Sequence, residues 1–256
     1  WLRTHPLTTE RIADIEARIR DLPYRQRVDS LDFALVKARL RVLQDDTPRG
    51  WRDASTLFSE QIKQGSPAQV LGARYGLAMI ALRQRELSQA RALMDELRLE
   101  VERKPTLTPS AVLLGLEIES ALAQNQPQQA VTMAEAGRLR FPLSRSLSMQ
   151  YADALLAAGR ATEAARFLRD QAQLYRQDAA IHKVLARAYA EQNKQALQHI
   201  ALAEYYALTG ALPAALEQLR IARASPDAAF HDLAIIDARE RELQASWREI
   251  MSQRKR

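Results

Sequence analysis

Hydrophobic and small residues recur at helical spacing along most of this chain, and the pattern is clearest over residues 200–227. Two helix faces are marked there by Leu202, Ala203 and Tyr206 and by Ala215, Leu219 and Ala222. Gly210 lies between the two faces, where it allows the left-handed end of a helix, and Pro226 stops the second helix. The pattern therefore predicts two antiparallel helices joined by a tight turn.

Weaker copies of this hairpin occur earlier in the chain. Each copy has a small residue at the same place in its second helix, and the four small residues are Ala90, Ala130, Ala164 and Ala215. Their intervals are 40, 34 and 51 residues, and 34 is the period of the tetratricopeptide repeat (TPR), which the hairpin resembles. We interpret the longest interval as one repeat plus an extra helix. The second helix of the hairpin that this extra helix begins would be compressed or missing near Asn193.

The predicted fold is all-α, a TPR-like α-solenoid of antiparallel helix hairpins with about 12–13 helices. A four-helix bundle and a HEAT-like array are the alternatives. Strands are not expected, because alternating runs rich in Val and Ile are absent. Helices are predicted over residues 25–43, 51–64, 68–83, 88–103, 110–123, 127–140, 143–158, 178–192 and 228–252. In the first of these, the residues expected to share one apolar face are Val28, Leu31, Leu35, Val36, Leu40 and Leu43.

Composition and charge are consistent with the predicted fold. Of the 256 residues, 47% are hydrophobic and 27% are charged, which is ordinary for a globular protein. The formal charge is +6, and only 6 of the 37 basic residues are Lys. Such a balance would suit an acidic partner, but the basic residues are spread along the chain, whereas nucleic-acid binders cluster them. We therefore assign them to solvated helix faces and expect no nucleic-acid partner.

The sequence also limits the covalent and membrane chemistry. Cys is absent, which excludes disulfides and cysteine-based sites. No apolar run approaches the roughly 20 residues that a membrane span needs, so no transmembrane segment is expected. The chain starts at Trp1 rather than Met, from which we expect a part of a longer protein.

Motifs for catalysis or metal binding are missing from the sequence. It contains no HExxH, no Walker loop, no Gly-rich dinucleotide turn and no GxSxG. Glu117 and Glu119 lie two positions apart on one predicted helix and face different ways, which argues against an acid–base pair. The four histidines, His5, His182, His199 and His231, lack the carboxylate pattern of a metal site. We expect no catalytic residue, cofactor or metal in this segment.

A binding surface is the remaining kind of function. In a TPR array the first helices of the hairpins line a concave groove. The residues expected to line it are Tyr75, Met79, Arg83, Glu119, Met149, Asp153, Lys183, Arg187, Ile200 and Glu204. Lys183 and Arg187 lie one turn apart, and we expect them to hold a carboxylate of a partner. A solvated helix face is the alternative for any single one of these residues.

The N-terminal stretch and the array after it together resemble the BepA-like group of periplasmic zinc metallopeptidases. The matching N-terminal residues are Thr4, His5, Pro6, Arg11 and Ile12, and residues 202–219 resemble the repeats in the C-terminal half of those proteins. The resemblance implies three parts. Residues 1–23 would end an upstream metallopeptidase domain, residues 24–227 would form the TPR-like array, and residues 228–256 would form a capping helix and a basic tail.

By this resemblance, the chain is a non-catalytic protein–protein interaction module of a periplasmic protease and chaperone, peripheral to the outer membrane. Its partners would be the barrel-assembly machinery and unfolded outer-membrane barrel substrates. The HExxH and the zinc of the family lie upstream, so zinc is expected in the parent protein, with His5 near it. A cytoplasmic TPR scaffold or regulatory adaptor without a protease is the alternative, and an upstream signal peptide and HExxH would distinguish the two.

Overall fold

The structure is a computed structural model, and it describes residues 8–19, 30–103 and 109–253. The chain divides into two compact units, Trp1–Ser30 and Leu31–Arg256. Each unit has its own helices and is described by itself.

The described part of the first unit is the helix α1 (Thr8–Ile19). Ile12 and Ile15 lie on it at the spacing expected from the sequence, and their side chains are 50% and 55% exposed. Residues 1–7, which include Thr4, His5 and Pro6, lie outside the described residues. The expected place of His5 near a zinc ion therefore stays a prediction.

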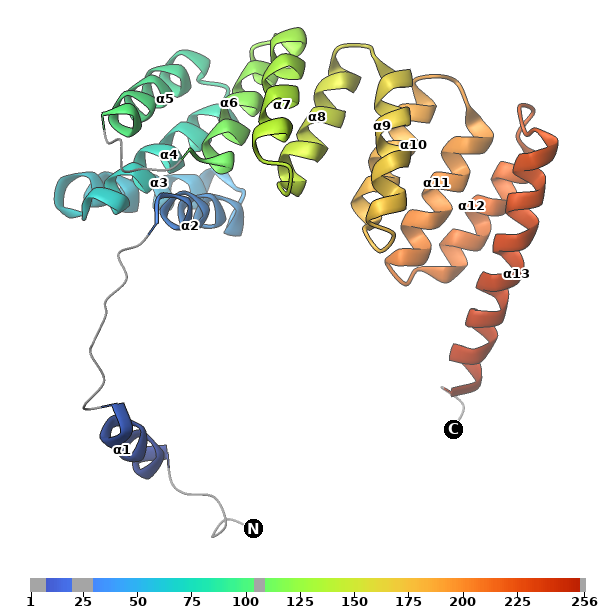
Figure 1. Cartoon of the computed structure of the whole chain (residues 1–256), viewed down its shortest axis with the longest axis horizontal. Coiled ribbons are helices and arrows are strands. Elements are labelled where there is room, and N and C mark those ends of the chain that lie inside the picture. The colour runs from blue at the N-terminus through green and yellow to red at the C-terminus, as the bar shows by residue number, and fades with distance from the viewer. Residues whose placement is uncertain (1–7, 20–29, 104–108, 254–256) are drawn as a thin grey trace. The chain divides into compact units, whose positions relative to one another are not determined.

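The described part of the second unit is a succession of helices, each in contact with the next one along the chain (Figure 1). The helices are α2 (Leu31–Gln44), α3 (Pro48–Gln64), α4 (Pro67–Arg83), α5 (Leu87–Glu102), α6 (Ala111–Ala123), α7 (Pro127–Arg140), α8 (Arg145–Ala157), α9 (Ala161–Leu174), α10 (Ala179–Ala190), α11 (Gln195–Leu208), α12 (Leu212–Ala224) and α13 (Phe230–Gln253). With α1 they number thirteen within the described ranges, where no strand occurs, and the all-α solenoid prediction is confirmed.

Five of the turns between helices share one backbone conformation. Each contains a residue with positive φ, and these residues are Arg85, Asn125, Gly159, Asn193 and Gly210. The next residue donates its backbone N–H to the carbonyl five positions back, over 2.8–3.0 Å. This is the Schellman hydrogen bond that closes a helix C-terminus. Asn125, Gly159 and Asn193 follow one another at 34-residue intervals, which is the TPR period.

The helix starts are equally well defined by local sequence. Ser66 begins α4 with a full capping box, in which its hydroxyl accepts from the backbone of Gln69 and the Gln69 side chain accepts from the Ser66 backbone. Ser, Thr or Asp side chains also cap α3, α6, α8 and α10. Pro stands in the first turn of α3, α4, α7 and α12, where its missing N–H removes no helical bond.

The core depends on small residues at the helix contacts. The four repeat alanines, Ala90, Ala130, Ala164 and Ala215, are all 0% exposed. A small side chain lets two helices approach, while the large side chains around it fill the remaining space. The buried residues form three clusters along the second unit, one over α2 to α6, one over α6 to α11 and one over α11 to α13.

The apolar face of α2 is only partly the one predicted, because Leu31 and Leu35 are buried as expected but the other described members of the predicted set are not. Val36, Leu40 and Leu43 are 39%, 61% and 41% exposed. The residues that α2 buries are Leu31, Ala34, Leu35, Ala38 and Val42. The packing is close, because a Cβ added at Gly72 of α4 would lie 2.8 Å from the carbonyl oxygen of Ala34. The prediction followed the bulky residues, whereas this contact requires the small ones; Val28 lies outside the described residues.

The second hairpin helix that we expected to be compressed or missing near Asn193 is present. α11 begins at Gln195, five residues earlier than the start of the predicted hairpin, and contacts both α10 and α12. It is therefore the second helix of the α10–α11 hairpin and the first helix of the α11–α12 hairpin. Gln198 stands where the other second helices have their repeat alanine, five residues after the turn residue, which is why the alanine pattern did not detect α11.

The repeated turns generate a test of stability. A Cβ at Gly159 would meet no atom within 4 Å, so Gly159→Ala changes only the strain of a left-handed backbone. We expect it to destabilise the protein by about 1 kcal/mol, while Arg85→Gly, which removes the same strain, is expected to be neutral or stabilising by up to about 1 kcal/mol. Thermal unfolding followed by circular dichroism measures both. A lower melting temperature for Arg85→Gly would contradict this account of the turns.

Candidate functional site

Eight of the ten residues predicted to line a groove lie on α4, α6, α8 and α10, and Ile200 and Glu204 lie on α11. We call the surface formed by α2, α4, α6, α8 and α10 the first-helix face. Neighbouring members of this set contact one another. Tyr75 and Met79 do not line an open surface, since their side chains are 0% and 1% exposed. They pack in the core of α2 to α6, because the close approach of α2 to α4 covers them.

A hydrogen-bonded network crosses this face from α2 to α8. Arg39 Nη2 lies 2.6 Å from Glu119 Oε1, and Arg39 Nη1 donates to the Tyr75 hydroxyl over 3.1 Å. Gln150 Nε2 donates to the same Glu119 oxygen over 3.1 Å and to the carbonyl of Gly115 over 3.0 Å. Burial would lower the pKa of Arg39, but the hydrogen bond and the charge of Glu119 outweigh it and raise that pKa above its ordinary value.

Four of the other predicted charged residues, Arg83, Asp153, Arg187 and Glu204, are also paired within the protein. Arg83 Nη1 lies 2.7 Å from Asp46 Oδ2, and Arg187 Nη1 lies 2.9 Å from Asp153 Oδ1. Glu204 accepts two hydrogen bonds of 2.8 Å from Arg239.

The last three predicted residues lie beside aromatic or apolar groups. The Nζ atom of Lys183 lies 5.8 Å from the centre of the Tyr205 ring. Met149 and Ile200 are partly buried against the core clusters. The structure therefore brings the predicted charged residues other than Lys183 into pairs with groups on neighbouring helices or loops, and it does not leave them as a row of free groups. Arg187 already holds a carboxylate, that of Asp153.

The Glu119 network generates a prediction about stability. Replacing Glu119 by Gln would leave the half-buried Arg39 without its carboxylate, and we expect a loss of about 1–2 kcal/mol. The matched control is Glu217→Gln, which breaks an exposed pair with Arg220 one turn away on α12, and there we expect no measurable loss of stability. Urea denaturation of the two variants measures both values, and equal losses would contradict a structural role for the network.

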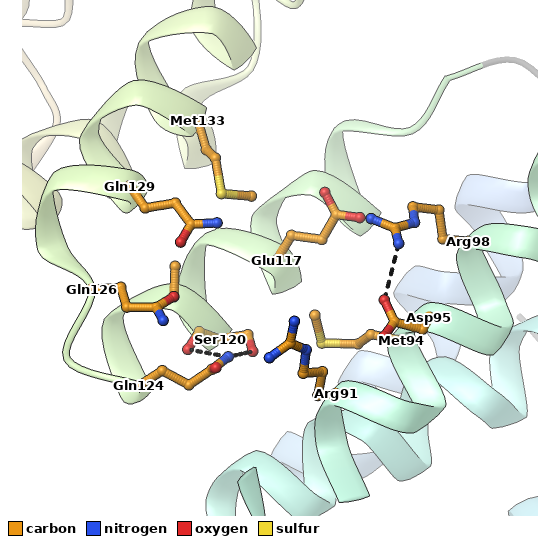
Figure 2. A pocket seen from close by; sticks show the side chains of 11 residues that line it. Arg91, Met94, Asp95, Arg98, Glu117, Ser120, Gln124, Gln126, Gln129 and Met133 are labelled. Carbon is orange, nitrogen blue, oxygen red and sulfur yellow. Dashed lines mark hydrogen bonds and ion pairs between the residues drawn. The ribbon is translucent and has the colours of Figure 1, made fainter. Parts of the chain in front are cut away.

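A second surface feature lies among the second helices of the hairpins. A cavity of about 320 Å³ opens between α5 and α7, with α6 as its floor. Figure 2 shows side chains from these three helices around one space, with the Glu117 carboxylate pointing toward the side of Arg98. An adjoining cavity of the same size shares Arg98 and Glu117 and continues toward Leu113 and Phe141. We call the two cavities together the α6 furrow.

Glu117 is the half-buried acid in the middle of the α6 furrow. Its carboxylate makes no hydrogen bond or ion pair with any described residue. Burial raises its pKa, Asp95 and Glu102 raise it further, and only Arg98 opposes them. Arg98 is itself bound to Asp95 over 3.0 Å. Glu119, two positions along the same helix, lies in the first-helix network, so the two acids have separate environments.

The raised pKa of Glu117 predicts a pH-dependent stability. Ionisation of a group whose pKa is higher in the folded state opposes folding at neutral pH, and this penalty disappears below its ordinary pKa of 4.5. Glu117→Gln should therefore melt at a higher temperature than the wild type at pH 7, and the difference should vanish on acidification below 4.5. The exposed Glu135 supplies the control, Glu135→Gln, for which no gain is expected. Equal melting temperatures at pH 7 would contradict the burial of Glu117.

The sequence reasoning missed the α6 furrow, although a signal for it was present. Glu117 occupies a helix position at which the neighbouring hairpins carry Leu or Tyr.

Metal binding has no comparable support: the described residues contain no group of three His, Cys, Asp or Glu side chains that could hold an ion. His199 pairs with Gln218 at 2.8 Å, and burial lowers the pKa of His182. None of the described helices is long and apolar enough to cross a membrane.

Comparisons with known proteins agree with this architecture. Residues 116–179, which run from within α6 through α7, α8 and α9 to the first residue of α10, match the tetratricopeptide repeat family model. Over 238 residues, 93% of this chain, the sequence is 28% identical to the beta-barrel assembly-enhancing proteases of Escherichia coli (strain K12) and Shigella flexneri. The corresponding protein of Yersinia pestis is 24% identical over 242 residues. The chain spans about half of the length of these relatives, 47% in each case. The resemblance predicted from the sequence is confirmed.

Proposed function

We propose that this chain is a non-catalytic protein-binding module of a periplasmic protease that assists the assembly of outer-membrane β-barrels. TPR arrays act in protein–protein interaction, because their stacked hairpins present long continuous surfaces. The observation that carries the proposal is the similarity over 93% of the chain to beta-barrel assembly-enhancing proteases. Its partners would be the barrel-assembly machinery and unfolded outer-membrane barrel proteins.

The proposed module requires no chemistry of its own. The described residues do not fit a zinc site, so zinc is proposed for another part of the protein, and no step of the binding function uses it. The first-helix face offers the docking surface. Its Arg187–Asp153 pair is exposed, with side chains 56% and 39% accessible, and such a pair contributes little to stability. Arg187 can therefore exchange the internal carboxylate for one on a partner, with Lys183 one turn away.

Binding assays with purified partners test the proposed function. We expect the wild-type chain to bind the barrel-assembly complex or a urea-unfolded outer-membrane barrel protein in biolayer interferometry. Lys183→Glu combined with Arg187→Glu should weaken this binding about a hundredfold or more, since each charge-assisted contact contributes about 1.5–3 kcal/mol and each 1.4 kcal/mol is a factor of about ten in affinity. Circular dichroism should show unchanged helix content.

The control for charge alone is Arg220→Glu on α12, at a residue 70% exposed and outside the first-helix face. It should leave the affinity unchanged. Unchanged affinity of the double variant would remove Lys183 and Arg187 from the docking surface. Failure of the wild-type chain to bind either partner would overturn the proposed function itself.

A further inference from the structure

The five repeated turns give their hairpins a common numbering, and Glu117 is an exception within it. The residues eight positions before the positive-φ residue of each turn are Leu77, Glu117, Tyr151, Leu185 and Leu202. Tyr151 and Leu185 are buried, and Leu77 and Leu202 are partly buried against the core clusters. Only the third hairpin of the second unit has a charge at this position.

This position lies where the second helices of neighbouring hairpins stay apart. No Cα atoms of α5 and α7, or of α7 and α9, come within 8 Å of each other in the described part of the chain. Side chains must therefore fill the space above the first helix. At α7 to α9 they do so, since the guanidinium carbon of Arg138 lies 5.0 Å from the centre of the Tyr151 ring and 5.4 Å from that of Phe167.

The corresponding residues fill two other junctions as well. Ala172, Leu185 and Ala201 belong to one core cluster at α9 to α11, and Ile62, Leu77 and Leu93 pack against another at α3 to α5. At α5 to α7 the same positions hold Arg98, Glu117 and Met133, and the space above α6 remains open. The opening therefore follows from one substitution in the repeat pattern, Glu where an apolar residue is otherwise used.

The immediate neighbours of the Glu117 carboxylate favour a cationic ligand group, although Arg91 and Arg140 also line the α6 furrow. Its carboxylate has no partner among the described residues, and the nearest guanidinium, Arg98, is bound to Asp95. Glu102 adds a second negative charge to this region. An ammonium or guanidinium group entering the α6 furrow would give the half-buried carboxylate a charge-assisted hydrogen bond, which no described residue provides.

The remainder of the α6 furrow has the length and the hydrogen-bonding groups for an extended chain. From Leu113 to Gln124 its floor follows α6 for about 17 Å, the length of about five residues of extended polypeptide. The side chains of Arg91, Gln126 and Gln129 make no hydrogen bond with the described residues. A Gln amide offers one donor group and one acceptor, as a peptide group does.

We propose that the α6 furrow binds an extended polypeptide segment of about five residues that places a Lys or Arg side chain on Glu117. The inference deepens the proposed function and rests on it, since it names the chemistry of a bound segment at a surface separate from the first-helix face. Arg91 and the glutamines hold the peptide backbone at one end, and Leu113 and Phe141 contact apolar side chains at the other.

Selection from a phage-displayed library of random peptides on the wild-type chain tests this inference. We expect the enriched peptides to carry Lys or Arg flanked by apolar residues. Their affinity should fall about tenfold for Glu117→Leu, which loses the charge-assisted contact. This variant places at Glu117 the residue that three other hairpins have there, and we expect it to melt no lower than the wild type.

Glu135→Leu on α7 is the matched control and should bind the peptides as the wild type does. Enriched peptides without a basic residue, equal affinity for Glu117→Leu and the wild type, or no enrichment at all would overturn the inference. Each of these results leaves the proposed function standing if the wild-type chain still binds the barrel-assembly complex. If Lys183→Glu with Arg187→Glu abolishes that binding while the peptides still bind, the two surfaces act separately.

Discussion

The rest of the second unit depends on one constraint, the left-handed turn in which a backbone N–H donates to the carbonyl five residues earlier. It occurs at Arg85, Asn125, Gly159, Asn193 and Gly210, and it ends α4, α6, α8, α10 and α11 at a defined residue. Because a helix has a fixed rise and rotation per residue, a defined end also decides which side chains face the next hairpin. The contacts between hairpins, the ion pairs and the α6 furrow are therefore consequences of where the turns fall.

The two surfaces that result from this register are chemically different. On the first-helix face, charged residues meet across neighbouring helices, and pairs such as Arg39–Glu119 and Arg187–Asp153 satisfy them. Among the second helices, side chains must fill wider spaces, and aromatic or aliphatic residues do so at most junctions. The junction at Glu117 is unfilled. A protein-binding role fits both surfaces, but by different means: exchange of an exposed ion pair on the first, and occupation of an existing space on the second.

The helices and their order could be predicted from the sequence, because helix starts and ends have local signals. Pro127 and the Arg140 end of α7 were predicted as observed, since Pro at a helix start and Phe141-Pro142 after its end act through neighbouring atoms. The core face of α2 and the second role of α11 could not be predicted this way. They depend on which partner helix comes close. Ala34 is only weakly hydrophobic, so the sequence pattern does not mark it, although α4 contacts α2 there.

The residues predicted to line a groove show a related limit of sequence reasoning. Helical spacing correctly groups residues on one side of a helix, but it does not say whether a neighbouring hairpin supplies a partner, as Asp153 does for Arg187 or Arg39 does for Glu119. Glu117 shows the reverse case. A half-buried acid without a partner opposes folding, yet an array in which each hairpin contacts mainly its neighbours confines that cost to one junction. Stability lost there is recovered when a ligand supplies the missing cation, so the same residue that weakens the free protein would favour its bound state.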